Sequence, residues 1–76
     1  VKPDPTIVFD IMKEAGVSRD EVLYVGDSGV DMQTAVNSGV TSIGVTWGFR
    51  DRKELLVNGA QHIIDEPCEI MKWVIL

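Results

Sequence analysis

Two runs rich in β-branched and aromatic residues, 22–25 and 41–47, constrain the fold of this chain more than any other feature. Residues of this kind favour strands, and runs without polar alternation are typical of strands buried on both faces. Each run is followed by a glycine and then by a segment whose apolar residues recur at helical spacing. Strands that alternate with helices in this way predict right-handed crossovers and a parallel sheet.

Helices are predicted at 5–15, 31–38 and 51–58, and a last one from Pro67 onward. A glycine lies just beyond each of the first three, where helices commonly end. Ser18 and Glu21 have the spacing of a capping box, which predicts a brief helical turn before the first strand. The apolar residues expected to face inward are Val8, Ile11, Met12, Ala15, Met32, Ala35, Val36, Leu55, Leu56, Ile70, Met71, Trp73 and Val74.

The predicted order is helix, strand, helix, strand, helix, a minimal strand at 62–64, and helix. It corresponds to an α/β fold, a three-layer α/β/α Rossmann-like parallel sheet that is incomplete. The strand at 22–25 is apolar enough to need a neighbour on each side, and the chain supplies an obvious one only at 41–47. We therefore expect residues 1–76 to be one portion of a single domain, completed by a strand from elsewhere. Self-association through the uncovered sheet edge is the alternative.

The charge balance excludes several kinds of partner. Twelve acidic and seven basic residues give a net charge of -5, which argues against binding many phosphates of a nucleic acid. No apolar run approaches the roughly 20 residues that cross a bilayer, so no membrane partner is expected. The single cysteine, Cys68, cannot form an internal disulfide, which fits a reducing compartment. We expect a cytoplasmic protein.

Acidic side chains follow the first predicted strand, at the place where parallel sheets bind ligands. Asp27 follows residues 22–25 after a single glycine, Gly26, and Asp31 lies four residues on, at the start of the next helix. Two neighbouring carboxylates repel each other unless a cation lies between them. Oxygen ligands of this kind suit Mg²⁺, which typically takes one or two carboxylates together with water and substrate phosphate. Asp27 and Ser28 are equally explained as a turn and a helix cap, because both residue types are preferred there.

Four other side chains have a chemical and a structural interpretation. Lys2 precedes Pro3, which favours an extended backbone, and its ammonium group would neutralise a phosphate or a nucleophilic carboxylate unless it is simply solvated. Arg50 leaves a strand at the same end as Asp27 and would meet a substrate anion, although charge runs of this kind usually begin a solvated helix. His62 is expected to have a packing role, and Cys68 to be a small core residue rather than a nucleophile.

Several short motifs follow one another at characteristic intervals. They are Lys2-Pro3-x-Pro5, Val25-Gly26-Asp27-Ser28-x-x-Asp31, Gly44-Val45-Thr46-Trp47-Gly48-Phe49, Asn58-Gly59-Ala60 and Ile63-Ile64-Asp65. In this order they resemble the haloacid dehalogenase-like hydrolase superfamily, and most closely its phosphoglycolate phosphatase-like branch. The resemblance runs the whole length of the chain and favours the metal-binding interpretation of Asp27 over the capping one.

The resemblance implies roles for individual residues. Lys2 matches the family's third motif, a lysine that steadies the nucleophile and the phosphoryl group of the substrate. Asp27 and Asp31 match the fourth motif, with Asp27 as the direct Mg²⁺ ligand and Asp31 as its support, often through water. Ser28, with Lys2, is expected to contact the substrate, a small phosphorylated metabolite such as phosphoglycolate or a sugar phosphate.

The same resemblance implies that part of the catalytic machinery is missing from this chain. The family's nucleophilic aspartate, its acid/base aspartate and its phosphate-binding Ser or Thr lie on earlier strands, and no segment here matches them. In the family the phosphoryl group passes to that aspartate and water then hydrolyses the covalent intermediate. We therefore expect this chain to be the C-terminal portion of a phosphatase core that lacks the cap domain. This portion is expected to be inactive unless the N-terminal part of the protein is present.

Two alternatives remain at this point. Within the same fold, a sugar phosphomutase, a pyrophosphatase or a dehalogenase would share these motifs, and the absent cap domain would decide between them. A receiver-like or other non-catalytic α/β module would also bind metal in an acidic pocket. A receiver carries its acidic pair after the first strand and a lysine late, whereas here Lys2 comes first, so the order of motifs favours the hydrolase.

Overall fold

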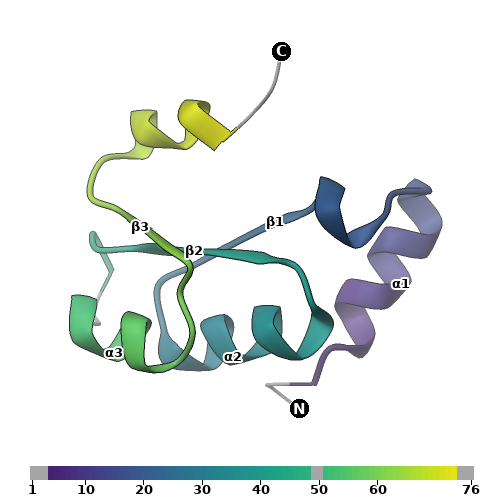
Figure 1. The fold of residues 1–76 in the computed structure, drawn as a ribbon, viewed down its shortest axis with the longest axis horizontal. Helices are drawn as coiled ribbons and strands as arrows, with labels where there is room; N and C mark the ends of the chain where they lie inside the picture. Colours follow the sequence, from purple (N-terminus) through teal and green to yellow (C-terminus); the bar gives the residue numbers. More distant parts are fainter. Residues whose placement is uncertain (1–3, 49–50, 74–76) are drawn as a thin grey trace.

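The computed structural model describes residues 4–48 and 51–73, in which helices and strands alternate as predicted (Figure 1). The elements are α1 (Thr6–Ala15), the 3-10 turn η1 (Arg19–Glu21), β1 (Leu23–Gly26), α2 (Gly29–Ser38), β2 (Thr41–Val45), α3 (Arg52–Val57), β3 (His62–Ile64) and the 3-10 helix η2 (Pro67–Trp73). Lys2, Phe49, Arg50 and Val74 lie outside the described residues.

The three strands form one parallel sheet in the order β1-β2-β3. Leu23 pairs with Thr41 and Gly26 with Gly44, while Ile43 pairs with His62 on the other side of β2. Within the described residues, β1 has a strand on one side only, so it is an edge strand here. The predicted parallel α/β sheet is confirmed, and it is incomplete.

The two faces of the sheet are covered by different elements (Figure 1). On one face α2 and α3 pack close to the backbone, because Gly44 leaves room for the Leu55 side chain, which is fully buried. On the opposite face Ile43 and Val45 pack with residues of β3 and η2. This alternation along β2 is the period of two expected of a strand. It produces the three layers that the sequence predicts.

Local side chains explain where the helices begin and end. The Asp4 carboxylate accepts a hydrogen bond from the Thr6 backbone N–H at 2.9 Å just before α1. The Ser18 N–H donates to Glu21 Oε1 at 2.9 Å, which confirms the predicted capping box. Gly16 ends α1 with φ +70, a left-handed conformation that side chains other than glycine rarely adopt.

Part of the predicted core is wrong. Ile11, Val36 and Leu56 were expected to face inward, but their exposed fractions are 59%, 53% and 53%. The reason is that each helix buries only a narrow stripe of its surface; the stripe of α1 packs against Ala35 and Val40. In α1, for example, only Val8 and Met12 are buried.

The last helix also differs from the prediction, because Pro67–Trp73 is a 3-10 helix. With about three residues per turn, positions i and i+3 share a face. Ile70 and Trp73 therefore pack together against the sheet, whereas Met71 is 55% exposed. Cys68 lies on the exposed side of this helix, so the prediction of a small core residue is wrong.

Candidate metal centre

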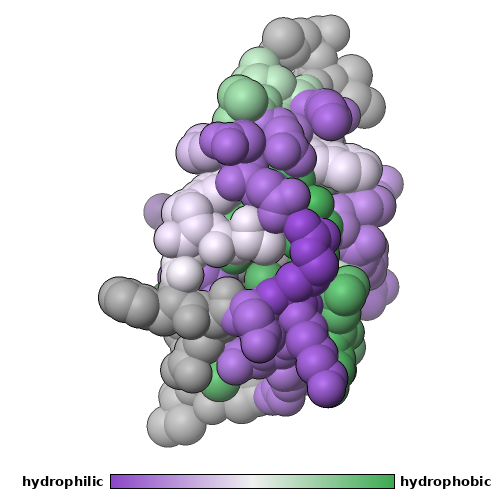
Figure 2. Space-filling view, turned by 90° about the vertical axis from the view of Figure 1, so that its left-hand side faces the viewer, coloured by the Kyte–Doolittle hydropathy of each residue, from purple (hydrophilic) through white to green (hydrophobic). Residues whose placement is uncertain are grey.

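The carboxyl ends of all three strands lie at one edge of the sheet, and each is followed at once by a polar side chain. Asp27 follows β1, Thr46 follows β2 and Asp65 follows β3. Figure 2 looks onto this side of the molecule, where hydrophilic residues run in a band across the surface. The strand topology thus brings together residues that lie far apart in the sequence.

Asp31 is folded back onto the end of β1. Its carboxylate oxygen Oδ2 accepts a hydrogen bond from the backbone N–H of Asp27 at 3.3 Å. A Cβ atom at position 26 would lie 2.4 Å from the Asp31 Cβ and 2.8 Å from its Oδ2. Only a glycine at position 26 therefore leaves space for the Asp31 side chain in this position.

Ser28 is the N-cap of α2, since its Oγ accepts a hydrogen bond from the Asp31 N–H at 3.2 Å. The capping interpretation is thus correct for Ser28, and its contact with a substrate stays a prediction. Asp27 has a different environment: no hydrogen bond between described residues occupies its carboxylate, which is half-buried. The carboxylate of Asp27 is therefore available for a ligand.

The turn that follows β2 lies directly against Asp27. A Cβ atom at Gly48 would lie 2.4 Å from Asp27 Oδ2 and 2.6 Å from the Asp27 Cβ, closer than van der Waals contact permits. The Asp27 side chain is thus confined between the end of its own strand and the backbone of the neighbouring loop. The backbone at Gly48 therefore limits, on this side, the positions open to the Asp27 carboxylate.

Helix α3 supports the first turn of α2 from the side. Glu54 Oε2 accepts a hydrogen bond from the Gly29 N–H at 2.8 Å, across 25 positions of sequence. Gly29 also lies close to the Asn58 side chain, and a Cβ there would lie 2.4 Å from Asn58 Nδ2. The turn that carries Ser28 and Asp31 is therefore packed against α3 as well as against β1.

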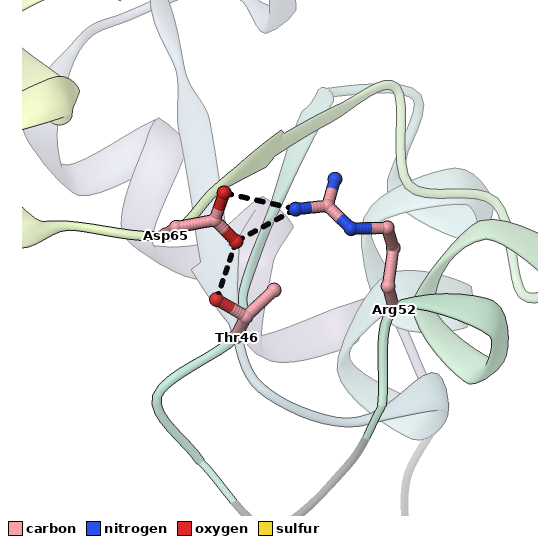
Figure 3. A network of polar contacts seen from close by, with 3 residues as sticks. All are labelled: Thr46, Arg52 and Asp65. Atoms are coloured by element: carbon pink, nitrogen blue, oxygen red, sulfur yellow. Dashed lines mark hydrogen bonds and ion pairs between the residues drawn. The ribbon is translucent and has the colours of Figure 1, made fainter.

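A second polar network joins the ends of β2 and β3 to the start of α3 (Figure 3). The Thr46 hydroxyl donates to Asp65 Oδ1 at 2.7 Å, and Arg52 Nη2 donates to both carboxylate oxygens of Asp65 at 2.7 and 2.9 Å. Two partners lower the pKa of the Asp65 carboxyl below its ordinary value. The hydrogen bond from the Thr46 hydroxyl is the largest single cause, and Arg52 adds to it. About half of the Arg52 and Asp65 side chains is exposed, so water weakens this ion pair.

The residues present fit a hard divalent cation. Asp27, just after β1, and Asp31, in the first turn of α2, offer two carboxylates. Mg²⁺ typically takes one or two carboxylates from a protein. No group of three or more His, Cys, Asp or Glu residues that could hold a metal ion occurs in the described part of the chain. A cation here would therefore take its remaining ligands from water and from groups that these residues do not supply.

The other residues predicted from the sequence lie apart from this pair or cannot be placed. Lys2 and Arg50 lie outside the residues that the structure describes. The His62 ring stacks on Trp73 with ring centroids 3.9 Å apart, which confirms its packing role. Gly48, Glu54 and Asp65 were not predicted to matter for the site. Gly48 offered a signal, because it follows a strand at the same sheet edge as Asp27, whereas nothing in the sequence indicates the contact of Glu54 with Gly29.

The family comparison matches the first three fifths of the chain. A sequence model described as "Haloacid dehalogenase-like hydrolase" matches residues 1–45. The phosphoglycolate phosphatase of Pseudomonas savastanoi pv. phaseolicola is 35% identical over 65 residues, which is 86% of this chain and 24% of that protein. The chain thus spans about a quarter of the length of this relative.

Solved structures agree with the fold. A Lactobacillus delbrueckii protein provisionally named phosphoglycolate phosphatase has a TM-score of 0.88 and 39% identity, over 99% of this chain and 31% of that protein. A Thermotoga maritima protein provisionally named beta-phosphoglucomutase has a TM-score of 0.83 and 28% identity, over 99% of this chain and 36% of that protein.

None of the described helices has the length and apolar character that a membrane crossing requires.

Proposed function

The chain belongs to the haloacid dehalogenase-like hydrolase family, and we propose that it is the C-terminal portion of a magnesium-dependent phosphatase for a small phosphomonoester. Phosphoglycolate or a sugar phosphate is the proposed substrate, as the names of a phosphoglycolate phosphatase and a phosphoglucomutase among the similar proteins suggest. The observation that carries this proposal is the Asp27 carboxylate, which is half-buried at the end of β1 and confined by Gly48. Asp31 lies in the first turn of α2, and its carboxylate accepts a hydrogen bond from the Asp27 backbone N–H.

We assign the roles as follows. Asp27 would bind Mg²⁺ directly, and Asp31 would support it while bonded to the Asp27 backbone. The cation, when bound, would neutralise charge on the phosphoryl group. Ser28 lies at the N-terminus of α2, where a substrate oxygen would meet the positive end of the helix. Lys2 would neutralise the phosphoryl group or the nucleophile.

The nucleophile would come from the N-terminal part of the protein, on a strand that pairs with β1. Val25 supports this, because it is 45% exposed although its partner across the sheet, Ile43, is fully buried on the same face. A further strand and its helix would cover Val25 and satisfy the open edge of β1. Without that part, the chain would hold the cation but have no aspartate to attack the phosphoryl group, and so would be inactive.

The test uses the complete gene product with p-nitrophenyl phosphate and a panel of metabolite phosphates, with and without Mg²⁺. We expect Mg²⁺-dependent release of phosphate, nearly abolished by Asp27→Asn and severely reduced by Lys2→Ala. Asp20→Asn is the matched control, because Asp20 lies in η1, at the opposite end of β1 from Asp27. There its carboxylate accepts a hydrogen bond from the Ser18 hydroxyl. Full activity of Asp27→Asn would refute the metal assignment. Mg²⁺ binding without turnover would favour the non-catalytic module.

A sugar phosphomutase is the second candidate, favoured by the structural similarity to the Thermotoga maritima protein. The same site would serve both reactions, since each passes a phosphoryl group through an aspartate. The two are separated by the product: a phosphatase releases inorganic phosphate, whereas a mutase converts one sugar phosphate into its isomer. We expect phosphate release to dominate.

A further inference from the structure

The segment between β2 and α3, residues 46–52, is held at both of its ends by a single carboxylate. Asp65 accepts a hydrogen bond from Thr46 at the start of the segment and from Arg52 at its end (Figure 3). The start is fixed a second time, because the Thr46 N–H donates to the Ile64 carbonyl at 3.2 Å. Asp65 therefore joins Thr46 to Arg52.

The same segment carries Gly48, which lies against the Asp27 carboxylate. Gly48 is only two residues from Thr46, so a change in the direction of the segment at Thr46 would move Gly48 relative to Asp27. The ion pair is too exposed to contribute much to stability. Its geometric effect on the segment is the more important consequence.

We propose that Asp65 is a positioning residue for the metal centre. By binding Thr46 and Arg52 together, it holds Gly48 against Asp27 and keeps the Asp27 carboxylate in the orientation that binds a divalent cation. Groups outside the ligand set commonly orient metal ligands in this way. The inference rests on the proposed function, because it takes Asp27 to be a ligand.

The charges of the network allow a test in which positioning and simple electrostatics predict opposite signs. Arg52→Gln removes a positive charge, which by electrostatics alone would tighten the binding of a cation. Thr46→Val removes the hydroxyl group without changing the charge. If the network positions Asp27, both variants weaken cation binding. We expect a loss of about three- to tenfold, less than the ~10–100-fold typical when a direct partner of a ligand is removed.

The experiment measures Mn²⁺ binding to the complete gene product, from the electron paramagnetic resonance signal of free Mn²⁺, without substrate. Thr46→Ser keeps the hydroxyl group and is expected to retain the wild-type affinity. Asp65→Asn is expected to weaken binding as the other two variants do. Asp20→Asn removes the same charge at the far end of β1 and is expected to leave the affinity unchanged.

The possible failures can be distinguished. If the wild type does not bind Mn²⁺, or if Asp27→Asn binds it as tightly, the metal centre is wrong and the positioning role falls with it. If binding depends on Asp27 but Thr46→Val and Arg52→Gln leave it unchanged or tighter, the metal centre stands and the positioning role of Asp65 is wrong.

Discussion

Replacing Gly48 by alanine is the most direct test of how the candidate metal centre is built. The added Cβ would lie 2.4 Å from Asp27 Oδ2, 2.6 Å from the Asp27 Cβ and 2.8 Å from its Cγ. Moving the oxygen out to a tolerable 3.0 Å requires a shift of about 0.6 Å. Rotation of the carboxylate does not relieve the contact with the Asp27 Cβ, so the loop itself must move.

A shift of this size matters more for the site than for the fold. Mg²⁺ demands near-ideal octahedral geometry at about 2.1 Å from its ligands. Misplacement of a reacting group by about 1 Å can reduce the rate about 100-fold. We therefore expect Gly48→Ala to lower Mg²⁺-dependent turnover of the complete gene product by about 10- to 100-fold. The free energy of unfolding should fall as well, because the clash with the Asp27 Cβ is relieved only by movement of the loop, and the lower entropy of the unfolded alanine chain offsets only part of that cost.

Gly16→Ala is the matched control, because it is expected to lower stability without affecting turnover. Gly16 has φ +70, and a Cβ there would meet nothing within 4 Å, so the substitution strains the backbone at the end of α1 without any clash. It should lower the free energy of unfolding by about 1 kcal/mol and leave turnover unchanged. Kinetics at saturating and limiting Mg²⁺, together with thermal unfolding, separate the two effects. Wild-type turnover in Gly48→Ala would refute the confinement of Asp27.

Three further predictions concern the fold. Leu55→Ala should lower the free energy of unfolding by about 2–5 kcal/mol, because Leu55 is fully buried. Leu56→Ala, at a position that is 53% exposed, should change it by less than about 1 kcal/mol. Urea unfolding of both variants measures the difference, and equal losses would contradict the packing of α3. The pKa of Asp65 is lowered, so its interactions stabilise the fold at pH values above the ordinary pKa of 3.8. This stabilisation is lost as the pH falls through the lower pKa of the folded state. Unfolding measured against pH should therefore show a difference between wild type and Asp65→Asn that is constant near neutrality and disappears in acid; a difference that persists in acid would count against this. The 76-residue chain alone should associate in light scattering through the open edge of β1, and a cooperative monomer would argue against a missing neighbouring strand.

The fold could be predicted largely because its signals are local. Gly16 and Gly39 end α1 and α2 where the sequence indicated, since a left-handed residue stops a helix whatever surrounds it. The ends of the strands were less accurate, because they depend on partners. β2 ends at Val45 rather than at Trp47, for its neighbour β3 offers only three residues for pairing, the last of which is Ile64.

The candidate site divides in the same way. The proximity of Asp27 and Asp31 could be predicted because they are four residues apart, at the junction between the end of β1 and the first turn of α2. Their role as metal ligands stays a prediction. Cofactor, substrate and cytoplasmic location stay predictions.

The support of the site could not be predicted, because it joins segments that are close only after folding. Gly48 is 21 positions from Asp27, and whether they touch depends on the path of the turn after β2. The first residue of that turn, Thr46, is in turn bound by Asp65, which follows a different strand. In a parallel sheet each loop at the carboxyl edge is connected to its own strand and helix, so neighbouring loops align only through contacts of this kind. In our proposal, contacts of this kind are what would let an exposed ion pair influence a candidate metal site that it does not touch.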